Sequence, residues 1–168
     1  MRLFSGLLAT LLAAGVLSVL GWGLAHTAKP PVLRVGAAAP DLTVELLDGS
    51  STHIVALRGK PLVVNFWATW CADCRRESGA LRDAARATPG VRFLGVLYQD
   101  TASAARTYQS GADAYPYPIG WSDGAGSAFG VQANPETFFI DAAGVVRAIA
   151  LGPMTQQQLA TDLQKAAT

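Results

Sequence analysis

The only two cysteines of this chain, Cys71 and Cys74, stand three residues apart. Residues 61–68, just upstream, form an apolar, β-branched and aromatic run that is typical of a strand buried on both faces. Residues 74–87 have the apolar spacing of an amphipathic helix. Cys71 is therefore predicted to lie where a buried strand meets the N-terminus of a helix.

This position predicts that Cys71 is the reactive thiol. The free N–H groups and the positive dipole end of a helix favour a thiolate, and such thiols have pKa values of roughly 3.5 to 7.5. Ala72, Asp73 and Arg75 are the candidate pKa-tuning residues; Arg75 should lower the pKa of Cys71 and Asp73 should raise it. Cys74, one turn into the helix, is expected to be less exposed and to attack a disulfide formed at Cys71, which is dithiol–disulfide exchange.

A lone Cys-x-x-Cys also fits other kinds of site. Structural zinc needs four ligands, and His26 and His53 are the only histidines. A purely structural disulfide would close a loop too short to stabilise the fold much. A peroxidase of the peroxiredoxin type needs Thr-x-x-Cys, and Thr69 is too close to Cys71. Redox exchange at the Cys71–Cys74 pair, with no metal and no bound cofactor, is the favoured interpretation, and a copper-binding module stays as an alternative.

The segment Asn65-Phe-Trp-Ala-Thr-Trp-Cys-Ala-Asp-Cys-Arg75 resembles the active site of the membrane-tethered thioredoxin-like thiol:disulfide oxidoreductases, the TlpA, ResA and DsbE/CcmG group. Residues 39–42, 47–49 and 57–65 agree with this resemblance, which covers about residues 36–165, and residues 130–141 look most like DsbE/CcmG. The resemblance implies an α/β thioredoxin fold, a central mixed sheet flanked by helices, with an N-terminal β-hairpin added.

The resemblance also implies a substrate-binding surface. Pro135 matches a cis-proline that faces the Cys-x-x-Cys motif, and Asn134 before it would offer backbone groups to an extended substrate. Trp70, next to Cys71, is the third candidate substrate-binding residue.

Asn65 is an informative departure from ordinary thioredoxins, which have a buried aspartate here that takes the proton from the second cysteine. An amide cannot act as that base. Glu136, beside the proline, is the expected replacement and Asp73 the second candidate. Glu77 and Asp100 are weaker candidates, and Glu77 is expected to face water.

Other elements follow from local patterns. A hairpin is predicted over residues 41–54 around Asp48-Gly49, and a helix capped by Asp100 or Thr101 should run to about Gln109. Residues 115–121 are predicted to be irregular, followed by a short helix capped by Ser122-Asp123. Residues 137–140 and 145–151 are predicted strands, and a capping box at residues 155–158 opens the last helix.

The N-terminus and the composition indicate one domain plus a membrane-directed segment. With 51% apolar residues and a net charge of +1, the chain has no basic run for nucleic acid, and we expect a monomer. Leu3–Ala25 carries no charge and would span about 34 Å as a helix. The predicted organisation is a signal-anchor helix over residues 1–25, a linker over 26–35 and a thioredoxin-like domain over 36–168. A signal peptide cleaved after Ala25, which leaves a soluble periplasmic protein, is the alternative.

The expected function is that of an enzyme, a thiol:disulfide oxidoreductase. The resemblance implies a single-pass protein of the cytoplasmic membrane whose catalytic domain faces the periplasm. It would reduce disulfides of protein substrates such as apocytochrome c, with electrons from a membrane thiol donor of the CcdA or DsbD type. A general extracytoplasmic oxidase or reductase that is not tied to cytochromes is the alternative enzyme.

Overall fold

The computed structural model describes residues 13–22 and 33–168 of the chain. The chain divides into two compact units, Met1–Pro30 and Pro31–Thr168. Residues 13–22 form an exposed helix in the first unit. Over the two described ranges, no helix is both long enough and apolar enough to cross a bilayer. The remainder of the predicted anchor and most of the predicted linker lie outside the described residues.

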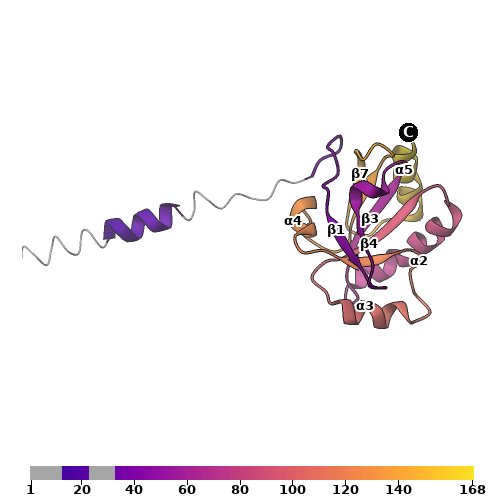
Figure 1. Ribbon diagram of the computed structural model, residues 1–168, viewed down its shortest axis with the longest axis horizontal. Coiled ribbons are helices and arrows are strands. Elements are labelled where there is room, and N and C mark those ends of the chain that lie inside the picture. The colour runs from indigo at the N-terminus through magenta and orange to yellow at the C-terminus, as the bar shows by residue number, and fades with distance from the viewer. Residues whose placement is uncertain (1–12, 23–32) are drawn as a thin grey trace, which may run out of the picture. The chain divides into compact units, whose positions relative to one another are not determined.

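The second unit is built on one mixed sheet of seven strands in the order β2-β1-β5-β4-β3-β6-β7 (Figure 1). The central strand β3 pairs in parallel with β4 and antiparallel with β6. The seven strands of the sheet are β1 (Thr43–Leu46), β2 (Ser51–His53), β3 (Leu62–Trp67), β4 (Arg92–Leu97), β5 (Ile119–Trp121), β6 (Glu136–Ile140) and β7 (Val146–Leu151). This is the expected thioredoxin-fold sheet, with β1 and β2 as the N-terminal hairpin.

Helices cover both faces of the sheet. They are the 3₁₀ helix η1 (Ile54–Leu57), α2 (Ala72–Ala87), α3 (Ala102–Gln109), α4 (Ala125–Phe129) and α5 (Gln156–Ala167). Alternate residues of β3 point to opposite faces, so Val63 and Trp67 join a core with α2, α3 and α5, while Val64 and Phe66 join a second core with α4. Burial on both faces explains the continuous apolar run of β3.

The predicted helix caps are partly confirmed. Thr101 Oγ1 accepts a hydrogen bond from the N–H of Ala104, and Thr155 Oγ1 accepts one from the N–H of Gln158, each at 3.2 Å. At α4 the expected cap is wrong, because Gly124 occupies the N-cap position and no side chain caps the helix.

The prediction of irregular structure over residues 115–121 is wrong at its end, where Ile119–Trp121 form β5. Pro116 and Pro118 make a strand here hard to predict from the sequence, because proline cannot donate to the hydrogen-bond ladder of a sheet. β5 exists because it pairs in parallel with β4 and antiparallel with β1, and both partners are distant in the chain.

Candidate redox active site

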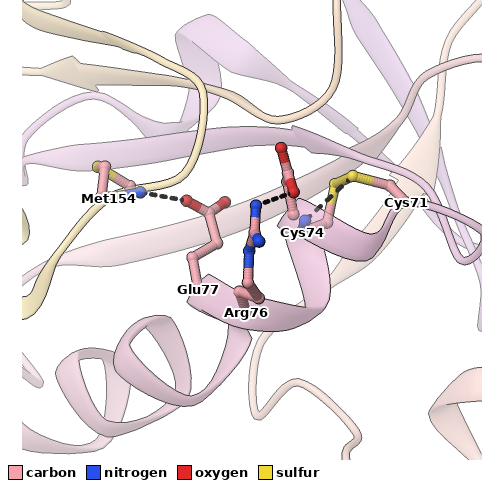
Figure 2. Close-up of polar contacts among 6 residues, drawn as sticks. Cys71, Cys74, Arg76, Glu77 and Met154 are labelled. Carbon is pink, nitrogen blue, oxygen red and sulfur yellow. Dashed lines mark hydrogen bonds and ion pairs between the residues drawn. A yellow bond between two sulfur atoms is a disulfide. The ribbon is translucent and has the colours of Figure 1, made fainter.

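Cys71 and Cys74 form a disulfide at the start of α2, after a short loop that follows β3 (Figure 2). Cys71 is the N-cap residue, and its Sγ accepts a hydrogen bond from the backbone N–H of Cys74 at 3.0 Å. The same donor would stabilise a Cys71 thiolate after reduction. Both cysteines are buried, with Cys71 at 4% and Cys74 at 1% exposure. Cys74 is the less exposed of the two, as expected, but the difference is small.

The loop before Cys71 is fixed by contacts with the segment that follows β4. The backbone N–H of Thr69 donates to Asp100 Oδ2 at 2.6 Å, and the indole N–H of Trp70 donates to the carbonyl oxygen of Gln99 at 3.0 Å. Trp70 nevertheless stays 59% exposed. The Trp70 ring is therefore an oriented apolar surface beside the disulfide.

The candidate pKa-tuning residues lie on the first turn of α2. The Arg75 guanidinium donates to the carbonyl oxygen of Thr69 at 2.9 Å, while Asp73 forms an ion pair with Arg76. Ala72 is the exposed first residue of the helix. Each of the two charged side chains thus has a partner: Arg75 binds the loop before Cys71, and Asp73 binds Arg76 of the same helix.

The Asn134–Pro135 peptide bond is cis, in agreement with the resemblance. Pro135 immediately precedes β6, whose first residue Glu136 pairs with Phe66 near the end of β3 that leads to Cys71. The Asn134 side chain donates to the carbonyl oxygen of Tyr98 at 2.8 Å. Within residues 33–168 the main-chain N–H and C=O of Asn134 make no hydrogen bond.

The prediction that Glu77 faces water is wrong, because its side chain is buried and the residue is only 2% exposed. Glu77 lies three residues after Cys74, on the same face of α2. Its Oε1 accepts a hydrogen bond from Asn65 Nδ2 at 3.1 Å. Its Oε2 accepts one from the N–H of Met154 at 3.0 Å, which Figure 2 shows. Burial raises the pKa of Glu77 to about 7, against the lowering effect of these two donors.

Glu136, the residue expected to act as the base, is also buried, at 6% exposure. Its carboxylate binds the backbone of the turn before Pro135. Its Oε1 accepts hydrogen bonds from the backbone N–H groups of Gln132 and Ala133, at 3.0 and 3.1 Å. These bonds order the turn before Pro135. The structure therefore brings Glu77, rather than Glu136, onto the same helix face as Cys74.

A signal for Glu77 was present in the sequence. Cys74, Glu77, Ser78 and Leu81 follow the three- and four-residue spacing of one helix face, and all four are buried. A charged residue in the middle of such a face is easily assigned to the solvent side, because charged groups are rarely buried without partners. The partners here, Asn65 and Met154, are remote in the chain.

The fold, the Cys71–Cys74 disulfide at a helix N-terminus and the cis-proline together define a thioredoxin-like thiol:disulfide oxidoreductase. The sequence model of the AhpC/TSA family matches residues 35–149. The chain therefore belongs to this family, and its relatives below place it among the DsbE- and ResA-like oxidoreductases.

Three comparisons support this placement. The chain is 40% identical over 123 residues to the thiol:disulfide interchange protein DsbE of Pseudomonas fluorescens, covering 71% of this chain and 68% of that protein. It is 30% identical over 135 residues to the thiol-disulfide oxidoreductase ResA of Geobacillus thermodenitrificans, covering 79% and 78%. The solved structure of MTB DsbF has a TM-score of 0.69 and 30% identity, covering 74% of this chain and 94% of that one.

Proposed function

We propose that this oxidoreductase works as a reductant outside the cytoplasmic membrane and that apocytochrome c is its substrate. The observation that carries the proposal is the Cys71–Cys74 pair at the start of α2, in a fold that also has the cis Asn134–Pro135 bond expected from the resemblance. The unpaired main chain of Asn134 and the exposed ring of Trp70 suit a protein substrate in extended conformation. The likeness of residues 130–141 to DsbE/CcmG supports the cytochrome role.

The first chemical step uses the reduced enzyme. The Cys71 thiolate attacks one sulfur of the substrate disulfide, the substrate S–S bond breaks, and a mixed disulfide forms. The released substrate thiolate takes a proton from water. The N–H of Cys74 and the N-terminal end of α2 favour the attacking thiolate.

The second step resolves the mixed disulfide. Glu77 accepts the proton of the Cys74 thiol, and the Cys74 thiolate then attacks Cys71 Sγ. The second substrate sulfur leaves as a thiolate and receives the proton from Glu77. The enzyme dithiol loses two electrons and becomes the disulfide, and the substrate disulfide gains them and becomes a dithiol. A carboxylate whose pKa is about 7 suits this task, because a general base works best when its pKa is near the working pH.

The oxidised enzyme must then be reduced again by another dithiol. We assign this role to a membrane thiol donor of the CcdA or DsbD type. The uncharged segment Leu3–Ala25 supports an N-terminal anchor that would keep the domain close to such a donor. Cleavage of that segment would leave a soluble periplasmic reductase with the same chemistry.

The reduction potential of the Cys71–Cys74 couple tests the direction of electron flow. We expect a value in the lower half of the range between about −270 mV for thioredoxin and about −120 mV for DsbA. Equilibration with dithiothreitol or glutathione buffers, followed by the fluorescence of Trp67 and Trp70, measures it. A value near that of DsbA would make the protein an oxidase. Normal cytochrome c assembly in a Cys71→Ser strain would remove the cytochrome role and leave a general reductase.

A further inference from the structure

Thr137 lies on β6 directly opposite Asn65 of β3. Both residues are buried, Thr137 at 0% and Asn65 at 2% exposure. A β-branched residue is expected in a buried strand, but valine has the same shape and avoids the cost of burying a hydroxyl. The hydroxyl of Thr137 therefore needs its own explanation, which the contacts of Asn65 provide.

The Asn65 amide is oriented by two acceptors. Its Nδ2 donates to Thr137 Oγ1 at 2.9 Å and to Glu77 Oε1 at 3.1 Å. Its Oδ1 is buried and has no hydrogen-bond partner among the described residues. An amide whose two N–H groups are both used while its oxygen is unpaired is held in place by the groups that accept from it.

We propose that Thr137 is a positioning residue for the redox reaction, whose hydroxyl holds the Asn65 amide nitrogen toward Glu77 and so keeps Glu77 ready to accept the Cys74 proton. This inference rests on the role proposed for Glu77 above. The Thr137 hydroxyl accepts from one N–H of Asn65 Nδ2, and this bond fixes the rotation of the amide so that the other N–H points at Glu77 Oε1. Without the hydroxyl, the amide could rotate away from Glu77, and the carboxylate would lose one of its two donors.

The surroundings of Glu77 make this amide important. Asp73, on the same helix, acts with burial to raise the pKa of Glu77. Tyr115 and Tyr117, from the segment before β5, stay neutral because burial raises the pKa of each phenol above its ordinary value. In the described part of the chain, the two donors that lower the pKa of Glu77 are both uncharged. The carboxylate is therefore stabilised by neutral donors, Asn65 Nδ2 and the N–H of Met154.

The test compares Thr137→Val, which removes the hydroxyl and keeps the shape, with Thr137→Ser, which keeps the hydroxyl. Resolution of a mixed disulfide between Cys71 and a model peptide is followed against pH in the full-length protein. We expect Thr137→Val to slow resolution about five-fold at pH 7, the factor given by one typical net hydrogen bond of about 1 kcal/mol. Its pH midpoint should move to higher pH, and Thr137→Ser should behave like the wild type.

A second measurement needs no substitution at Thr137. The side-chain amide resonances of Asn65 in the wild type should titrate with the midpoint seen for the Glu77 carboxyl carbon. The proposal would be overturned if Thr137→Val left both the rate of mixed-disulfide resolution and its pH midpoint unchanged. It would also be overturned if the Asn65 resonances did not change with pH as Glu77 titrates.

The variant Glu77→Gln separates this proposal from the function on which it rests. If Glu77→Gln flattens the pH profile while Thr137→Val leaves it unchanged, only the role of Thr137 is wrong. If Glu77→Gln keeps the wild-type profile, the roles of both residues are wrong.

Discussion

The backbone N–H of Met154 donates to Glu77 Oε2 at 3.0 Å, so the segment after β7 is bound directly to the helix that carries Cys74. Two residues earlier, the N–H of Gly152 donates to the carbonyl oxygen of Pro135 at 2.9 Å. One short segment thus holds both the buried carboxylate and the cis-proline. The helix that carries the two cysteines and the cis-proline turn are positioned by the same stretch of main chain.

The two cysteines should differ in reactivity. Cys74→Ser should accumulate mixed disulfides through Cys71, whereas Cys71→Ser should not, because only Cys71 lies at the helix N-terminus and receives the Cys74 N–H. Mass spectrometry of trapped adducts measures this difference. Faster alkylation of Cys74 than of Cys71 in the reduced protein at neutral pH would reverse the assignment.

Glu77→Gln should slow resolution of the mixed disulfide about 10- to 100-fold at pH 7 to 8, since the amide cannot accept the Cys74 proton. Glu136→Gln is the matched control. Its carbonyl oxygen can still accept from Gln132 and Ala133, so its rate should change less than about two-fold. Slow resolution in Glu136→Gln together with a normal rate in Glu77→Gln would return the role of base to Glu136.

Glu77 should make the oxidised protein less stable as the pH rises. Its folded pKa of about 7 lies above the ordinary 4.5, so the unfolded chain loses this proton first. The stabilising contribution is complete below pH 4.5 and is lost as the pH rises to about 7. Urea unfolding should show that Glu77→Gln gains on the order of 3 kcal/mol relative to wild type between these two pH values. A pH-independent difference between the two proteins would show that Glu77 is not perturbed.

The unprocessed chain should stay with membranes after carbonate washing, because an uncharged helix of the length of Leu3–Ala25 partitions strongly into a bilayer. Intact mass gives the matching control. A mature form that begins near His26 would show that the segment is a cleaved signal peptide.

Much of the fold could be predicted from local patterns. The continuous apolar run of β3 indicates a strand buried on both faces, and the capping residues Thr101 and Thr155 mark two helix starts through their side-chain hydrogen bonds. β5 could not be predicted in the same way. Its three residues follow Pro118, and their strand conformation comes from ladders with β1 and β4.

The sequence by itself determined the redox chemistry. Two cysteines three residues apart at a strand-to-helix junction can form a disulfide within one helical turn, with Cys71 at the helix N-terminus. These are local relationships, and any fold that keeps the junction keeps them. The resemblance carried by residues 65–75 added the cis-proline, which the structure contains.

Only the tertiary structure decided which buried carboxylate lies on the same helix face as Cys74. On an isolated helix Glu77 would face water, and its pKa would be ordinary. Asn65 from β3 and Met154 from the segment after β7 enclose it, 12 and 77 residues away in the chain. Glu136 is drawn instead to the backbone of the turn before Pro135. Burial and hydrogen-bond partners set the proton affinity of a carboxylate, and both depend on chain segments that meet only in the folded protein.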